Sequence, residues 1–146
     1  MRTVESILSA KGKDVWSIPP DTLVYDAIAL MAEKGIGALL VLEQGKVAGI
    51  FSERDYARRV ELEGRSSRDT LVSEVMTSRV AYVRPTQTMG ECMALMTDKR
   101  FRHLPVMDGE RLAGVVSIGD IVKAIISDQD FVIQQLENYI KGGSYF

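Results

Sequence analysis

The stretch GIFSERD, residues 49–55, recurs as GVVSIGD at residues 114–120. Both segments read Gly-x-x-Ser-x-x-Asp, and both follow a short apolar run. When the chain is aligned with itself at an offset of 65, residues 15–60 match residues 80–125 without a gap, with identical residues at 12 of the 46 positions. Ordinary composition gives roughly three identities by chance. The chain is therefore an internal duplication, and the fold is predicted as two copies of one unit.

Each copy predicts the same order of elements, β-α-β-β-α. A short extended segment, 15–18 or 80–83, is stopped by proline, and a helix follows it. Two apolar runs then flank the turns EQGK and DGER, whose glycines favour hairpins: these runs are 38–42 and 47–51 in the first copy, and 104–107 and 112–116 in the second. The last strand of each copy leads into the motif serine and a second helix. This order predicts an α+β fold in which small sheets carry helices on one face.

The expected boundaries follow from the repeat. We expect a first repeat over 1–60, a connector over 61–71, a second repeat over 72–126, and a C-terminal helix with its tail over 127–146. After residue 128, apolar residues recur at helical spacing, which predicts an added helix, and GGSYF is expected to fray.

The two central helices are expected to begin differently. In the second copy Thr88 and Glu91 have the spacing of a capping box. The first copy has Leu23 in place of the threonine, so Thr22 or Asp21 is the expected cap.

Composition excludes several classes of protein. The net charge of −2 gives no general attraction to nucleic acid or to an anionic membrane. A single cysteine, Cys92, excludes an internal disulfide framework, and its place on an apolar helix stripe predicts a buried, inert thiol. No apolar run is long enough to span a bilayer, and no signal peptide is indicated. A cytoplasmic protein is expected.

The repeated motif has two readings. Serine at a helix start with an acidic residue three positions later has capping-box geometry. The same helix start also presents unpaired N–H groups and a partial positive charge, which suit a phosphate. A carboxylate one turn into the helix can accept hydrogen bonds from the cis-diol of a ribose, and the preceding Gly49 or Gly114 would let a flat base approach the backbone. Spacing alone leaves both readings open.

These tandem units, each ending in Gly-x-x-Ser-x-x-Asp, resemble a pair of CBS (cystathionine-β-synthase) domains, known as a Bateman module. The segments that carry the resemblance are VSEVMT (72–77), ALLVLEQGKVAGIFSERDYAR (38–58) and RHLPVMDGERLAGVVSIGDIV (102–122). The resemblance spans roughly residues 4–126. It implies that the repeats pack about a pseudo-twofold axis and leave two clefts, each completed by both copies.

The resemblance also implies ligand-binding residues for an adenine nucleotide, such as AMP, ADP, ATP, NAD or an adenosyl compound. The motif aspartate would hold the ribose, the other copy's first strand would contact adenine through its backbone, and the residues before LPV would reach phosphates. One cleft is expected to use Ser52, Arg54, Asp55, Val83, Arg102 and His103. The other is expected to use Ser117, Asp120, Ser17, Ile18, Thr22, Gly37 and Ala38.

The two clefts are not expected to be equivalent. Arg102 and His103 align with Gly37 and Ala38, and Arg54 aligns with Gly119. The Asp55 cleft is therefore the better anion site, because arginine can bind phosphate through two hydrogen bonds. The Asp120 cleft is expected to hold only an adenosyl group, to bind weakly, or to borrow a basic residue from the other copy.

The resemblance implies a regulatory module that binds an adenine nucleotide and signals to a separate effector protein. It also implies a homodimer, either head-to-head or parallel, and the terminal helix is expected to be a dimer surface. No enzyme is expected, because the chain has one histidine, His103, one cysteine, and none of the common catalytic motifs. No metal site is expected, because His103 has no other ligands grouped near it. The alternative is a purely structural dimerisation or interaction module whose motifs act only as helix caps.

Overall fold

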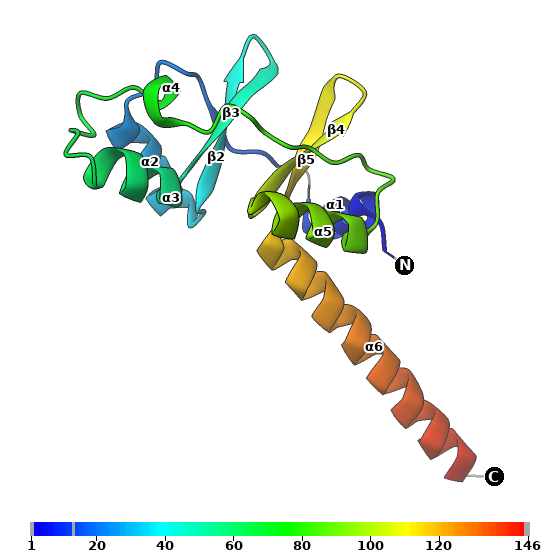
Figure 1. The fold of residues 1–146 in the computed structure, drawn as a ribbon. Helices are drawn as coiled ribbons and strands as arrows, with labels where there is room; N and C mark the ends of the chain where they lie inside the picture. The colour runs from blue at the N-terminus through cyan, green and yellow to red at the C-terminus, as the bar shows by residue number, and fades with distance from the viewer. Residues whose placement is uncertain (1, 13, 145–146) are drawn as a thin grey trace.

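The computed structural model describes the backbone of residues 2–12 and 14–144, and the side chains of these residues up to 140. The first repeat contains most of the elements on the left of Figure 1 and the second most of those on the right. Their bounds, in chain order, are α1 (Val4–Lys11), β1 (Ser17–Ile18), α2 (Val24–Lys34), β2 (Ala38–Glu43), β3 (Lys46–Ser52), α3 (Glu53–Asp55), the π-helix η1 (Tyr56–Glu61), α4 (Val72–Val75), α5 (Met89–Lys99), β4 (His103–Asp108), β5 (Arg111–Ser117) and α6 (Ile118–Ser144). The predicted α+β fold of two like repeats is confirmed.

The two sheets differ by one strand. In the first repeat β2 and β3 are antiparallel, and β1 joins β2 as a parallel third strand. In the second repeat only β4 and β5 form a sheet, and the predicted strand 80–83 is reduced to one bridge between Val83 and Val106. The amide of Leu40 donates to the Trp16 carbonyl at 3.3 Å in the first repeat. Its counterpart is Pro105, which has no N–H, so that hydrogen bond cannot form in the second repeat.

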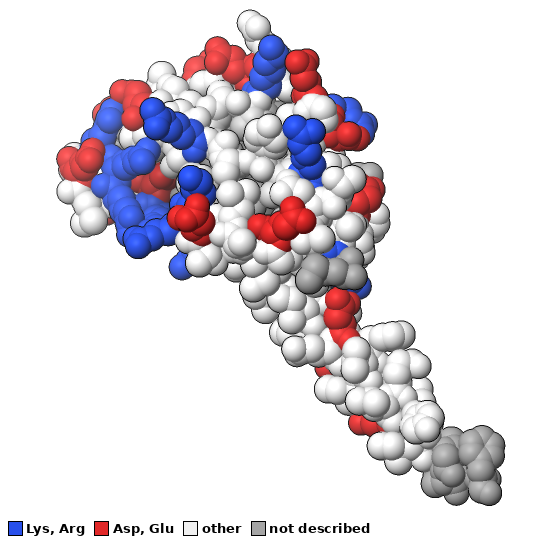
Figure 2. All heavy atoms as spheres, turned by 45° about the vertical axis from the view of Figure 1, so that its right-hand side comes forward, with Lys and Arg blue, Asp and Glu red and all other residues white. Residues whose placement is uncertain are grey.

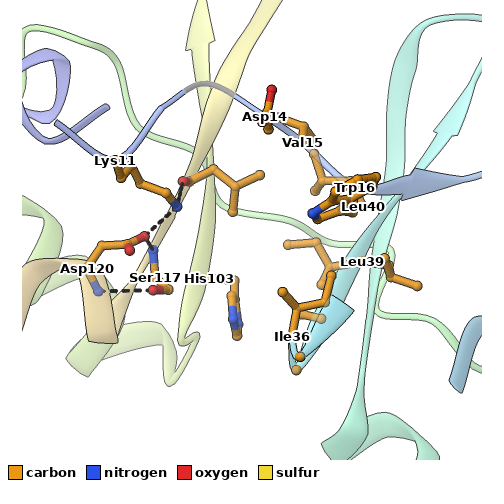
Figure 3. Close-up of a pocket in the computed structure, with 15 residues that line it drawn as sticks. Lys11, Asp14, Val15, Trp16, Ile36, Leu39, Leu40, His103, Ser117 and Asp120 are labelled. Carbon is orange, nitrogen blue, oxygen red and sulfur yellow. Dashed lines mark hydrogen bonds and ion pairs between the residues drawn. The ribbon is translucent and has the colours of Figure 1, made fainter. Parts of the chain in front are cut away.

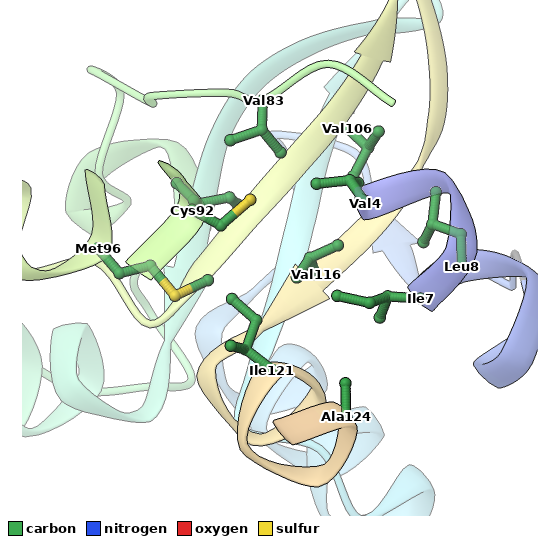
Figure 4. Packing of buried hydrophobic residues seen from close by; sticks show 11 residues of the cluster. Val4, Ile7, Leu8, Val83, Cys92, Met96, Val106, Val116, Ile121 and Ala124 are labelled. Carbon is green, nitrogen blue, oxygen red and sulfur yellow. The ribbon is translucent and has the colours of Figure 1, made fainter. Parts of the chain in front are cut away.

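The short helices that lead into the two repeats are exchanged between them. Helix α1 lies beside β5 and α6, and α4 lies beside η1 (Figure 1). Figure 4 shows α1 covering the core of the second repeat, where Val4, Ile7 and Leu8 are buried together with Val116 and Ile121. Each repeat therefore buries the apolar face of a helix that belongs, in sequence, to the other repeat.

Residues of α4 complete the core of the first repeat in the same way. Val72 and Val75 are buried against Val24, Phe51 and Val60. The exchange fixes the two repeats to one another through both hydrophobic cores, and it is the reciprocal contact that a pseudo-twofold arrangement requires.

The motif glycines are required by this exchange. A Cβ on Gly49 would lie 2.7 Å from the carbonyl oxygen of Thr77 and 2.8 Å from Sδ of Met76, just after α4. A Cβ on Gly114 would lie 2.9 Å from Cδ2 of Leu8 on α1. The expectation that these glycines leave room for a base is therefore wrong: the space beside each is filled by the lead-in segment of the other repeat.

The start of α2 is capped by the connector rather than by its own side chains. Leu23 is the N-cap residue and makes no side-chain capping bond, while the Thr22 hydroxyl donates to the Pro19 carbonyl at 2.8 Å. The amides of Val24 and Tyr25 donate to the carbonyls of residues 70 and 67, at 2.9 and 3.0 Å. The predicted cap at Thr22 or Asp21 is wrong, because connector carbonyls already satisfy these amides. In α5 the Thr88 hydroxyl accepts from the Glu91 amide, as predicted.

The C-terminal helix is longer than expected. The sequence predicts a separate helix after residue 128, whereas α6 begins directly after Ser117 and runs without a break to Ser144. Residues 121–141 contain neither glycine nor proline, so nothing in this segment stops the helix. Of the expected frayed tail, residues 142–144 are helical, and residues 145–146 lie outside the described part of the chain. Within that part, no helix is long and apolar enough to cross a membrane.

Substitution of the motif glycines should test the exchanged packing. We expect Gly49→Ala to lower the free energy of unfolding by about 1–3 kcal/mol, because the new methyl group meets backbone that cannot move alone. Gly114→Ala should cost less, because it meets the end of a flexible leucine side chain. Gly119→Ala is the control: its nearest neighbour would be Ser117 Oγ at 3.6 Å, so alanine should stabilise the helix by about 0.5–1 kcal/mol. Urea unfolding measures all three, and equal effects at residues 49 and 119 would contradict the exchanged packing.

Candidate functional site

Two clefts lie between the repeats, and each contains the motif of one repeat. The Asp120 cleft has a volume of about 320 Å³, and its walls come from α1, the segment before β1, β2, β4 and the start of α6. The Asp55 cleft is larger, at about 670 Å³, and lies between the start of α3 and the turn between α5 and β4. Each motif thus faces residues of the other repeat, as the resemblance implied.

In the Asp120 cleft the motif is a helix cap that also holds a lysine. Asp120 Oδ2 accepts the Ser117 amide at 2.8 Å, and Ser117 Oγ accepts the Asp120 amide at 3.1 Å. Lys11 Nζ, at the end of α1, lies 2.7 Å from the same carboxylate oxygen and also donates to the Val115 carbonyl at 2.9 Å. Figure 3 shows these contacts on one wall of the cleft, opposite Ile36 and Leu39 of the first repeat.

These contacts determine the charge of the Asp120 carboxylate. Its burial alone would raise the pKa, but the hydrogen bonds from the Lys11 ammonium and the Ser117 amide outweigh burial and hold the Asp120 pKa below its ordinary value. The carboxylate is therefore ionised at neutral pH. Within the described part of the chain its second oxygen, Oδ1, has no hydrogen-bond partner, so it can accept one from a molecule in the cleft.

In the Asp55 cleft the carboxylate is held on both oxygens. Oδ2 accepts from the amide and the hydroxyl of Ser52, each at 3.0 Å, and Oδ1 accepts from the Thr77 hydroxyl at 3.1 Å. Arg59 Nε lies 4.0 Å from Oδ1, and its Nη1 donates to the carbonyls of residues 75 and 76. Thr77 follows α4, so the lead-in segment of the second repeat reaches the motif carboxylate of the first.

The two clefts differ strongly in charge. Basic side chains exceed acidic ones around the Asp55 cleft, whose charged lining residues are Arg54, Arg58, Arg59, Lys99, Arg100 and Arg102, against Glu53 and Asp55. The charged lining residues of the Asp120 cleft are Lys11, Asp14 and Asp120. Figure 2 shows basic side chains gathered at the end of the molecule opposite to α6. The Asp55 cleft is therefore electrostatically suited to a polyanion, and the Asp120 cleft is not.

His103 lies between the clefts and lines both of them, as do Gly37 and Ile50. Burial lowers the pKa of His103 below its ordinary value, and Lys11 and Arg102 lower it further, against the opposing effects of Asp120 and Glu53. The imidazole is therefore neutral at physiological pH. It can donate from one nitrogen and accept at the other, toward either cleft.

An aromatic side chain stands at the Asp120 cleft. Trp16, the single tryptophan of the chain, lines it and is 44% exposed. The ammonium of Lys34 lies 4.4 Å from the centre of the Trp16 ring, on which it makes a cation–π contact. The Asp55 cleft has Phe101 among its lining residues.

The structure brings most of the expected site residues together. Around the Asp55 cleft lie Ser52, Arg54, Asp55, Arg102 and His103. Around the Asp120 cleft lie Gly37, Ala38, Ser117 and Asp120.

Four expected residues lie elsewhere. Val83 is fully buried, and both its backbone groups already bond to β4, at 3.0 and 2.8 Å. Ile18 is buried in the core of the first repeat, and Ser17 pairs with β2. The Thr22 hydroxyl is bound to Pro19, away from either cleft. The wall of the Asp55 cleft is formed instead by Val80, three residues before Val83. The wall of the Asp120 cleft is formed by Val15 and Trp16, three and two residues before Ile18.

The sequence reasoning missed several residues at the clefts. Arg59, Lys99 and Arg100 add charge to the Asp55 cleft, and Lys11, Trp16 and Thr77 make specific contacts. Lys11 lies at the point where the two copies differ by a three-residue insertion, which was the available signal. Thr77 ends the VSEVMT segment. Its role depends on the exchange of α4 between repeats, which local patterns do not show.

Other potentially reactive groups do not form a site. Among the described residues, no three His, Cys, Asp or Glu side chains are grouped as metal ligands. Cys92 is fully buried, and burial raises the pKa of its thiol to about 11, which disfavours the reactive thiolate.

Replacement of Lys11 by methionine should alter the pH dependence of stability. At neutral pH we expect the free energy of unfolding to fall by about 0.5–1 kcal/mol, the range for a partly exposed ion pair. Because the folded-state pKa of Asp120 is depressed, its contribution is fully present above the unfolded-state pKa of about 4 and is lost as the pH falls through the lower folded-state value. The wild type should therefore lose more stability than Lys11→Met in urea unfolding between about pH 5 and 3. Lys46→Met, outside both clefts, is the control, and parallel profiles for the wild type and Lys11→Met would contradict the assignment.

Comparison with known proteins gives one consistent result. A family model for the CBS domain matches the chain twice, over residues 4–62 and 72–127. The CBS domain-containing protein CBSX3, mitochondrial, of Arabidopsis thaliana is 39% identical over 151 residues, which cover 97% of this chain and 73% of that protein. YhcV of Bacillus subtilis (strain 168) is 30% identical over 126 residues, 86% of this chain and 89% of its own length.

Solved structures agree with this result. A CBS-domain protein from Burkholderia ambifaria MC40-6 superposes with a TM-score of 0.85 and 56% identity, covering 88% of this chain and 96% of that one. The CBS domain pair of protein MJ0100, solved with 5′-methylthioadenosine and S-adenosyl-L-methionine, shares the fold at a TM-score of 0.77 and 20% identity. The chain belongs to the CBS-domain family and carries a tandem pair of CBS domains.

Proposed function

We propose that this protein is a regulatory module that binds adenine nucleotides or adenosyl compounds in the two clefts between its CBS repeats and acts on a separate effector protein. The observation that carries the proposal is that each motif carboxylate stands at a helix start and faces the other repeat across a cleft. The CBS pair of MJ0100 was solved with two adenosyl compounds, which is a precedent for such ligands on this fold.

The Asp120 cleft fits the sugar of a nucleoside. Asp120 is ionised and has one oxygen without a partner in the described structure, which can accept a hydrogen bond from a ribose hydroxyl. Lys11 can turn from the carboxylate to a second ligand oxygen without leaving the cleft. The aromatic face of Trp16 and the apolar side chains of Ile36 and Leu39 suit a flat base. One lysine against two acidic residues favours an adenosyl group with few phosphates.

The Asp55 cleft fits a ligand with several phosphates. Six basic side chains line it, and Arg54 and Arg102 lie on opposite repeats. Guanidinium groups bind phosphate oxygens through paired hydrogen bonds. A ribose hydroxyl would have to compete with Thr77 for Oδ1 of Asp55, so the carboxylate has to exchange a partner on binding.

Binding in either cleft provides a mechanism for regulation. Each cleft has walls from both repeats, so a ligand that contacts both walls favours the arrangement in which they are close. No catalytic constellation is proposed. Burial keeps the Cys92 thiol protonated, and the Ser117 hydroxyl, on the residue that pairs with His103, is used as the cap of α6, where it accepts the Asp120 amide. Binding to an effector and a cytoplasmic location stay predictions, and the Arabidopsis relative is named as a mitochondrial protein.

A thermal-shift panel tests the proposal. We expect AMP, ADP, ATP, NAD, adenosine or S-adenosylmethionine to raise the melting temperature, because a ligand at 100 times its dissociation constant adds about 2.7 kcal/mol. Asp55→Asn and Asp120→Asn should each reduce this shift, measured against the variant's own ligand-free protein. Asp21→Asn, an exposed carboxylate away from the clefts, should leave it unchanged. No shift with any adenine compound would support the alternative of a purely structural module, whose motifs serve only as helix caps.

Fluorescence should separate the two clefts. Because Trp16 lies at the Asp120 cleft only, its emission should respond to adenosine, and Asp120→Asn should weaken this response at least about 10-fold in affinity. Arg54→Ala combined with Arg102→Ala should weaken ATP binding, measured by calorimetry, and leave the adenosine response of Trp16 intact. Equal loss of both ligands in both variants would contradict the assignment of phosphates to the Asp55 cleft.

A further inference from the structure

Most of α6 extends away from the rest of the protein (Figure 1). Asp128 makes an ion pair with Arg2 at 3.0 Å, and every residue from 129 to 140 is exposed. An isolated helix of this length is marginally stable in water. Its apolar side chains are nevertheless numerous, and those on one side form what we call the α6 stripe: Val122, Ile126, Ile133, Leu136 and Ile140, which are 47–68% exposed.

The α6 stripe follows a heptad. With Gln129 included, its members are separated by 4, 3, 4, 3 and 4 residues. In heptad notation the a positions are Ile126, Ile133 and Ile140, and the d positions are Val122, Gln129 and Leu136. Isoleucine occupies all three a positions and leucine one of the three d positions, and isoleucine at a with leucine at d is the combination that favours parallel two-stranded coils. Gln129 is the single polar residue of the seam, and one such residue can specify the register.

We propose that the α6 stripe pairs with the same stripe of a second copy of this chain, as a parallel two-stranded coiled coil. Parallel pairing places Gln129 opposite Gln129 of the second copy, where the two amides can hydrogen-bond to one another. Antiparallel pairing that aligns the two stripes places Gln129 opposite Ile133, which leaves a buried amide without a partner. It also places the two Asp130 side chains on the same flank of the seam, where their like charges repel. Both features favour the parallel arrangement.

The charged residues of α6 argue against a membrane as the partner of the α6 stripe. Helices that lie on membrane surfaces carry Lys and Arg on their polar face. Residues 124–140 contain no basic residue and include Asp128, Asp130 and Glu137. In Figure 2 the projecting helix is mostly white with a few acidic side chains. The stripe spans residues 122–140, about 27 Å at 1.5 Å per residue, which is long enough for a short coiled coil.

Sedimentation equilibrium of the full chain tests the pairing. We expect the wild type to be a dimer at micromolar concentration, and Ile133→Asn to raise the dimer dissociation constant at least about 100-fold, because each copy buries one more polar group in the seam. Phe131→Asn is the matched control: Phe131 is 65% exposed but lies on the opposite side of the helix, so the dimer should persist. The melting of the CBS body should be unchanged in both variants.

Cysteine crosslinking tests the orientation. Leu136→Cys should form a disulfide between copies under mild oxidation, because parallel pairing places the two d positions side by side. Phe131→Cys should not, and Cys92 is fully buried and cannot take part. A monomeric wild type, or a dimer that Ile133→Asn leaves intact, would overturn the proposal. A dimer without the Leu136→Cys crosslink would overturn the parallel arrangement, and a membrane-dependent pellet with lipid vesicles but no dimer would assign the stripe to a membrane.

Discussion

The exchange of the lead-in helices is the contact on which the rest of the structure depends. Helix α1 buries its apolar face in the second repeat and α4 buries its own in the first, so neither hydrophobic core is complete without a segment of the other repeat. A unit of about 60 residues buries too little surface to be comfortably stable alone. The exchange combines two such units into one body, and Gly49 and Gly114 are the positions at which the strands admit the incoming segments.

The same exchange builds the two clefts. Lys11 reaches Asp120 because α1 lies on the second repeat, and Thr77 reaches Asp55 because the segment after α4 lies on the first. Each motif carboxylate is therefore held by its own helix start and by a side chain delivered from the other repeat. The same contacts hold the two repeats together and position the carboxylates. A ligand that displaces Lys11 or Thr77 therefore also alters the contact between the repeats.

The sequence predicts what depends on local pattern and on repetition. The duplication correctly predicts the central helix and the hairpin of each repeat, and the resemblance to CBS pairs predicts that each motif faces the opposite repeat. Two errors could have been avoided. Strand 80–83 was expected in the second repeat, but Pro105 has no N–H to pair with it. A separate helix was expected after residue 128, but residues 121–141 contain no glycine or proline, so α6 is continuous. The exchange could not have been predicted, because nothing in the pattern of residues 4–8 tells which of two similar cores they enter. The place of Lys11 depends on that choice and was missed for the same reason.

The two repeats differ in the length of the helix that follows the motif. In the first repeat the helix after the motif ends at Glu61, beside α4. In the second repeat the helix that begins at the Asp120 cleft extends without interruption into the exposed α6 stripe. Asp120 lies in the first turn of α6, so one continuous helix joins the Asp120 cleft to the α6 stripe. If a ligand at the Asp120 carboxylate changes the pairing affinity of the stripe, thermodynamic linkage requires that pairing change the ligand affinity of the cleft by the same factor.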